Sequence, residues 1–101
     1  MDIERRLRVD PRQLAAVCGS THVAHLWLFG SILRPDFRPD SDVDVLVDFK
    51  PDASVGLLTL ARLRRELSDL FGRPVDLVPL RGLKPAVRDE VLASRELLYA
   101  A

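Results

Sequence analysis

Residues 41–49 read Ser-Asp-Val-Asp-Val-Leu-Val-Asp-Phe, and apolar and polar side chains alternate along them with a period of two. This alternation predicts a β-strand over residues 42–49, because successive side chains of a strand point to opposite faces. The valines and Phe49 share one face, which we expect to be buried. The opposite face carries three carboxylates and a leucine, namely Asp42, Asp44, Leu46 and Asp48.

Further elements are predicted on both sides of this strand. An apolar run over residues 23–29, closed by Gly30, predicts a second strand, and residues 75–80 predict a third. Leucines recur at helical spacing over residues 56–71, and Gly72 is a typical helix stop. The first two strands are expected to be antiparallel, and the third should return parallel to residues 42–49 through a right-handed crossover.

The flanking segments add helices to this sheet. Asp10 and Pro11 predict the start of a helix that ends near Gly19, and Pro85 opens a last helix to about Ala93. Residues 96–99 fit either the tail of that helix or a short edge strand. The order of elements predicts an α/β (α+β) fold, with a small mixed β-sheet of three to four strands and helices packed on one face. The 101 residues are expected to form a single domain, 1–101.

Charge and cysteine content narrow the range of functions. The formal net charge is zero, from 15 basic and 15 acidic residues, which argues against a nucleic acid partner held by its phosphates. Cys18 is the only cysteine, so an intrachain disulfide and a cysteine-based metal site are excluded. No apolar run approaches the roughly 18 residues of a membrane span, and the start of the chain lacks a signal-peptide pattern. We therefore expect a cytoplasmic protein without membrane contact.

Asp42 and Asp44 are the first candidates for chemistry. Two residues apart on a strand, they lie on the same face, about 6.6 Å apart along the backbone. Two carboxylates this close repel each other, and no lysine or arginine lies within the strand to compensate. A magnesium ion would, since it binds a few carboxylates together with substrate phosphates. A solvated sheet face would also tolerate the pair, so the two aspartates alone do not decide.

Gly30 and Ser31 follow the strand predicted over residues 23–29. Glycine permits close approach of a ligand to the backbone. Ser31 offers a hydroxyl, and the turn after it offers amide donors for a phosphate. A plain strand-ending turn would explain these two residues equally well when they are taken by themselves.

The two candidate elements are separated by the ten residues 32–41. This spacing resembles the Gly-Ser-x10-Asp-x-Asp signature of the nucleotidyltransferase superfamily to which DNA polymerase β belongs. Residues 26–31 and 41–47 also resemble the pattern of its minimal members, and the resemblance covers roughly residues 10–99. It implies a polymerase-β-like nucleotidyltransferase fold with a third carboxylate on the neighbouring strand, for which Asp76 is the candidate.

The resemblance also implies the roles of the site residues. Asp42, Asp44 and Asp76 would hold two Mg²⁺ ions, and Asp76 would act as the general base. ATP would be the substrate, with Gly30 and Ser31 holding its triphosphate.

Arg34 is a further nucleotide-binding candidate on the same grounds. Minimal members usually carry Arg-Gly after the turn that follows Gly-Ser, but here Pro35 follows Arg34. The conformation of this loop is therefore expected to depart from the family pattern.

Single-domain chains of this length resemble the antitoxin half of MNT–HEPN toxin–antitoxin pairs. In that family the enzyme transfers AMP from ATP to a tyrosine of a HEPN ribonuclease toxin, which implies a HEPN partner and either a hetero-oligomer or a homodimer. One alternative is an inactive antitoxin that neutralises its toxin by contact. Another is a nucleotidyltransferase acting on RNA or on a small molecule. Neutral charge disfavours RNA, and the lack of room for a second domain disfavours a small-molecule pocket.

Overall fold

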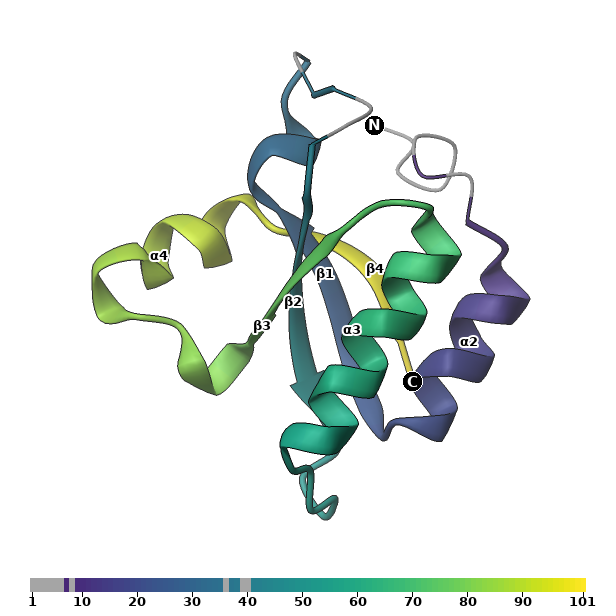
Figure 1. The fold of residues 1–101 in the computed structure, drawn as a ribbon. Coiled ribbons are helices and arrows are strands. Elements are labelled where there is room, and N and C mark those ends of the chain that lie inside the picture. The colour runs from purple at the N-terminus through teal and green to yellow at the C-terminus, as the bar shows by residue number, and fades with distance from the viewer. Residues whose placement is uncertain (1–6, 8, 36, 39–40) are drawn as a thin grey trace.

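A computed structural model describes residues 7, 9–35, 37–38 and 41–101 (Figure 1). The main elements, in chain order, are α2 (Pro11–Ser20), β1 (Val23–Phe29), β2 (Val43–Phe49), α3 (Leu57–Phe71), β3 (Val75–Pro79), α4 (Pro85–Ser94) and β4 (Glu96–Ala100). Short 3₁₀ helices follow two of the strands, η1 (Gly30–Leu33) after β1 and η2 (Leu80–Gly82) after β3. No helix of this described part is long and apolar enough to cross a membrane.

The described strands form one four-stranded sheet in the order β3-β2-β1-β4. β1 pairs antiparallel with β2, and β2 pairs parallel with β3 across the α3 crossover, as the sequence predicted. Of the two alternatives for residues 96–99, the edge strand is confirmed, because β4 pairs antiparallel with β1. The predicted fold class, a small mixed sheet with helices, is confirmed.

The main core lies between the sheet and the two helices α2 and α3, which cover the same face in Figure 1. It contains the alternating valines of β2 together with residues from both helices, including Val43, Val45, Val47, Leu14, Cys18, Leu63 and Leu67. The alternation of apolar residues in β2 is thus explained, because its valines are the side chains that are buried away from water.

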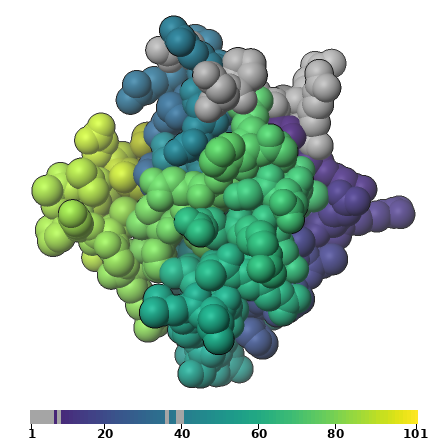
Figure 2. All heavy atoms as spheres, viewed as in Figure 1, coloured from purple at the N-terminus to yellow at the C-terminus, as the bar shows by residue number. Residues whose placement is uncertain are grey.

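The other face of the sheet is covered only in part. Leu46 is fully buried there in a second, smaller cluster with Leu83 and with Val91 of α4. In Figure 1, α4 lies on the flank of the sheet opposite to α2 and α3, and in the same view in Figure 2 its atoms form the edge opposite to those of α2. The expectation of helices on one face therefore holds for α2 and α3 and not for α4. The physical reason is Leu46, an apolar side chain on the carboxylate face that needs cover from water.

The ends of the helices follow from local capping. The Asp10 carboxylate accepts a hydrogen bond from the Arg12 amide at 2.9 Å and starts α2. Gly72 ends α3 in the left-handed conformation, with φ of 68°, and its amide donates to the Ser68 carbonyl. Because α3 stops there, the chain turns directly into β3, the strand that carries Asp76.

Candidate active site

Gly30 brings the backbone against the carboxylate of Asp44. Phe29, the last residue of β1, lies opposite Asp44 in the antiparallel register, so the chain turns beside that carboxylate. Gly30 has a φ of 73°, and a Cβ on it would collide with Asp44 Oδ2. Both the conformation and the contact require glycine at this position.

Ser31 is the second residue of η1 and contacts the same carboxylate. Its backbone amide donates a hydrogen bond to Asp44, while its carbonyl accepts one from the Arg34 amide at 3.0 Å. Arg34 is extended, with ψ of 150°, as expected for a residue before proline. Pro35 thus ends the turn at Arg34, whose positive charge acts on Asp44.

Asp76 joins the site through the parallel pairing of β2 with β3. Asp44 and Asp76 are direct partners in the register, so their side chains leave the sheet on the same face. The Val43 amide donates to the Pro74 carbonyl at 2.9 Å and fixes this register at the start of both strands. Asp42, two residues before Asp44, lies just ahead of β2. Asp42 and Asp76 are exposed, whereas Asp44 is half-buried.

The electrostatics of the site centre on Asp44. Burial raises the pKa of its carboxyl group above the ordinary value of 3.8, and the negative charges of Asp76 and Asp42 raise it further. The Ser31 amide and the Arg34 charge lower the pKa and offset only part of this effect. The ionised carboxylate is therefore held in an unfavourable position that a bound cation would relieve.

The donor chemistry fits magnesium bound together with a nucleotide. Within the described residues, no three His, Cys, Asp or Glu side chains converge as a ready-made metal cluster. Asp42 and Asp76 are nonetheless close enough to Asp44 to shift its pKa. Magnesium is usually bound by one or two carboxylates plus substrate phosphates, and rarely by a closed cage of protein ligands. The three aspartates and the adjacent Gly30-Ser31 turn offer these two kinds of ligand side by side.

Comparison with known proteins agrees with this geometry. A family model described as a nucleotidyltransferase domain matches residues 11–98, which include all the candidate site residues from Gly30 to Asp76. The chain belongs to the nucleotidyltransferase family. Protein adenylyltransferase MntA of Thermococcus cleftensis is 38% identical over 98 residues, covering 97% of this chain and 92% of that protein.

Solved structures place the chain among the minimal nucleotidyltransferases. One structure of a minimal nucleotidyltransferase is 39% identical, with a TM-score of 0.73 and 97% of each chain covered. A complex of tri-AMPylated Shewanella oneidensis HEPN toxin with MNT antitoxin matches at a TM-score of 0.58 and 20% identity, with 89% of this chain and 69% of that chain covered. The second likeness shows the fold alone. The family resemblance predicted from the sequence is confirmed.

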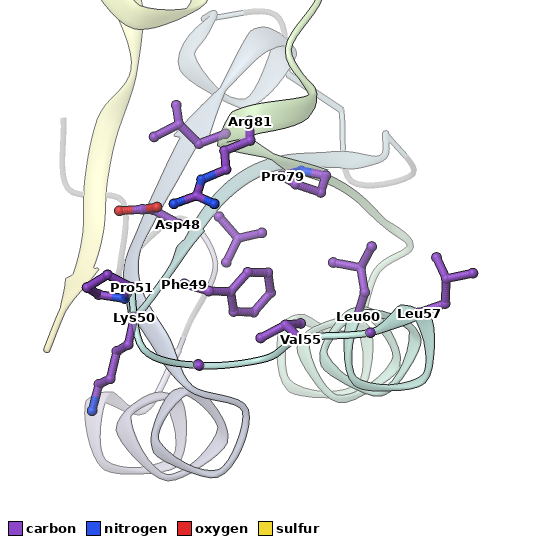
Figure 3. Close-up of a pocket in the computed structure, with 13 residues that line it drawn as sticks. Asp48, Phe49, Lys50, Pro51, Val55, Leu57, Leu60, Pro79 and Arg81 are labelled. Atoms are coloured by element: carbon purple, nitrogen blue, oxygen red, sulfur yellow. The ribbon is translucent and has the colours of Figure 1, made fainter.

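A cavity of this minimal nucleotidyltransferase lies away from the aspartates (Figure 3). It has a volume of about 380 Å³ and is formed at the far end of β2 and β3, where Phe49, Val55 and Leu60 point into it. Asp42, Asp44 and Asp76 do not line it. Its charged lining residues, Asp48, Lys50 and Arg81, do not form a group of carboxylates able to hold magnesium. The aspartates, and not this cavity, are therefore the candidate active site.

One group of contacts on the carboxylate face was missed by the sequence analysis. His25 Nδ1 lies 3.5 Å from Asp48 Oδ2, and the imidazole stacks on Trp27 with 5.3 Å between ring centroids. Arg95 lies over the same indole at 4.5 Å. Asp48 is four residues along β2 from Asp44, or about 13 Å, so this group is separate from the active site. His25 and Asp48 are partners in the pairing of β1 with β2. This pairing depends on a register shift between Val23 and His25, which the sequence pattern does not reveal.

Proposed function

We propose that this protein is a magnesium-dependent adenylyltransferase that transfers AMP from ATP to a tyrosine hydroxyl of a HEPN ribonuclease toxin and thereby acts as its antitoxin. The observation that carries the proposal is the pairing of Asp44 with Asp76 beside the Gly30-Ser31 turn. The choice of AMP and of a HEPN protein is supported by the relatives. One is named a protein adenylyltransferase, and another forms a complex with an AMPylated HEPN toxin.

The turn after β1 would bind the triphosphate. Gly30 lets the turn pass directly against the Asp44 carboxylate, so a phosphate bound by the Ser31 hydroxyl would lie next to the metal-binding aspartates. Arg34 adds positive charge on the same side of the site, since it already acts on Asp44. Asp42, Asp44 and Asp76 would hold two Mg²⁺ ions, which when bound supply positive charge to the triphosphate and to the attacking oxygen.

The proposed reaction is an in-line displacement at the α-phosphorus. The tyrosine oxygen forms a bond to the α-phosphorus, and the bond from that phosphorus to the oxygen bridging to the β-phosphate breaks. Pyrophosphate leaves with the bonding electron pair, and AMP stays on the tyrosine. The Asp76 carboxylate takes the phenolic proton, a role open to it because its side chain is exposed to an incoming acceptor.

Exposure of the site favours a macromolecular acceptor. Asp42 and Asp76 lie open at one end of the sheet, and a tyrosine carried on another protein can reach them. The zero net charge gives no basic surface surplus for an RNA acceptor. The cytoplasmic location and the single-domain organisation expected from the sequence stay predictions.

Transfer to the partner tests the proposal. The protein is incubated with Mg²⁺ and α-labelled ATP, with and without the HEPN protein encoded by an adjacent reading frame, and intact masses are measured. We expect AMP on the partner, and none with the Asp42→Asn/Asp44→Asn protein. Asp48→Asn is the matched control, since Asp48 lies on the same face of β2 outside the site, and it should transfer normally.

Two results would count against the proposal. Transfer by the double Asn protein would remove the assigned site. Tight binding of the partner without transfer from any nucleotide would favour an antitoxin that acts by contact alone.

A further inference from the structure

Arg73 connects the two segments that lead into the carboxylate strands. It lies between α3 and β3, three residues before Asp76, and its side chain reaches the segment that precedes Asp42. Arg73 Nη1 donates to the Arg38 carbonyl at 3.3 Å. Its guanidinium also lies over the ring of Phe37, with 4.7 Å from its central carbon to the ring centroid. The signature that relates this chain to its family does not include Arg73.

The Arg38 carbonyl also binds the residue just before Asp42. It accepts a second hydrogen bond, from the Ser41 amide at 3.1 Å. Arg73 therefore binds the same carbonyl oxygen that orients Ser41. Phe37 packs partly buried against the main core. The stack on Phe37 therefore ties this segment to the body of the protein.

The backbone of Arg73 is itself well anchored. Its amide donates to the Ser68 carbonyl at 3.2 Å, and the Val75 amide donates to Ser68 Oγ at 3.2 Å. The residue between them, Pro74, accepts the hydrogen bond from Val43 of β2. The backbone of Arg73 is thus held in place by hydrogen bonds next to the first residues of β2 and β3.

Asp42 depends on such support more than Asp44 does. β2 begins at Val43, so Asp42 lies outside the strand, and its side chain is exposed. Asp44 and Asp76, by contrast, are held in register by the pairing of β2 with β3. On its N-terminal side Asp42 is bonded to Ser41, whose amide is held by the same Arg38 carbonyl that Arg73 contacts.

We propose that Arg73 is a positioning residue which, through Phe37 and the Arg38 carbonyl, holds Asp42 within reach of Asp44 and Asp76 and so sets the affinity of the site for its divalent cation. This inference rests on the proposed function only for the identity of the reaction. Groups that orient metal ligands typically change metal affinity by about 10- to 100-fold when they are removed.

Metal binding tests this role without relying on transfer. Free Mn²⁺ is titrated by electron paramagnetic resonance in the presence of a non-hydrolysable ATP analogue, for the wild type and for Arg73→Ala, Arg73→Lys and Arg65→Ala. We expect Mn²⁺ affinity to fall about tenfold in Arg73→Ala. Arg73→Lys keeps a cation and a donor but loses the planar guanidinium that lies over Phe37, so its Mn²⁺ affinity should fall between those of the wild type and Arg73→Ala. Arg65→Ala, which removes an exposed arginine of α3, should change nothing.

Two further readouts separate positioning from general stability. Amide hydrogen exchange at Ser41 should quicken in Arg73→Ala, because its acceptor carbonyl is no longer held. In the AMP-transfer assay, excess Mg²⁺ should restore the rate of this variant to within about threefold of the wild type, which a folding defect would not allow. If Arg73→Ala folds poorly, Phe37→Leu keeps the apolar packing, removes the stack, and should also weaken Mn²⁺ binding.

Mn²⁺ affinity within twofold of the wild type in Arg73→Ala or in folded Phe37→Leu would overturn the inference, as would absence of Mn²⁺ binding by the wild type. A wild type that binds Mn²⁺ normally but transfers no AMP would contradict the proposed function alone, and the effect of Arg73→Ala on Mn²⁺ binding would still decide the role of Arg73.

Discussion

At the scale of single residues, Asp44 is the group on which burial, two carboxylates, an amide and an arginine all act. Burial together with Asp76 and Asp42 disfavours its charge, while the Ser31 amide and Arg34 favour it. A carboxylate in this state gains more from a bound cation than an exposed one does, because the cation offsets repulsion that is already present. The apo site is therefore less stable than an uncharged version of itself would be.

The first prediction concerns Gly30. Gly30→Ala places a Cβ against Asp44 Oδ2 in a left-handed conformation, so we expect a loss of about 1–3 kcal/mol in stability and at least about a hundredfold in transfer rate. Gly72→Ala is the matched control, since Gly72 also has positive φ but open space around its Cβ position. It should cost about 1 kcal/mol by urea unfolding and leave the transfer rate intact. Normal transfer by Gly30→Ala would contradict the assigned contact.

The second prediction concerns pH. The folded state raises the pKa of Asp44, so it holds the Asp44 proton more tightly than the unfolded chain does. Stability is lost as pH rises from about 3.8 through the folded pKa. In EDTA at pH 7, Asp44→Asn should therefore melt at a higher temperature than the wild type, and the difference should shrink toward pH 4. Calorimetry across this range checks it, and a lower melting temperature for Asp44→Asn at pH 7 would contradict it.

At the scale of elements, β2 serves the core and the site with alternate residues. The valines of β2 pack against α3, and the intervening positions carry Asp44 and Leu46. A change at one of the valines should therefore affect stability, and a change at Asp44 should affect chemistry, whereas a change at Leu46 should affect stability because Leu46 is buried in the second cluster.

The third prediction compares two leucines of α3. Leu67 is fully buried against the sheet, so Leu67→Ala should cost about 2–5 kcal/mol in unfolding free energy. Leu58, on the same helix, is 89% exposed, and Leu58→Ala should stay within about 0.5 kcal/mol of the wild type. Urea unfolding measures both. Similar losses for the two variants would mean that α3 is packed differently.

The sequence predicted the main elements and the pairing of the strand of Asp44 with the strand of Asp76. Alternation identified the strand that carries Asp44, and the rule for right-handed crossovers placed the strand of Asp76 beside it. Local patterns could not give the contacts of Arg73 with Phe37 and Arg38, because those depend on how one loop packs against another. For the same reason the contact of His25 with Asp48 was missed, since a bulge shifts the register of β1 against β2.

At the scale of the whole molecule, the two ends of the sheet differ in chemistry. One end carries the aspartates and the Gly30-Ser31 turn, and the other carries the apolar cavity beside Leu57, which is 84% exposed. Under the proposed function, an acceptor protein would reach the first end, and the cavity would lie away from the transfer reaction.

The fourth prediction uses Cys18 as a probe of the whole fold. Burial raises the pKa of this thiol to about 12, so the reactive thiolate is scarce in the folded protein even at pH 9. A thiol reagent should react with Cys18 only when the core between α2 and the sheet opens. The rate of reaction in increasing urea should follow the unfolding transition, and prompt reaction in native buffer would contradict the buried position.

A crystal structure with Mn²⁺ and a non-hydrolysable ATP analogue tests most directly whether the aspartate end of the sheet is the site of nucleotidyl transfer. Anomalous scattering should place Mn²⁺ against Asp42, Asp44 and Asp76, with the triphosphate on Gly30 and Ser31. The three carboxylates should turn toward one another on binding. Metal and triphosphate bound elsewhere, such as in the cavity at the other end of β2, would contradict the assignment of the active site.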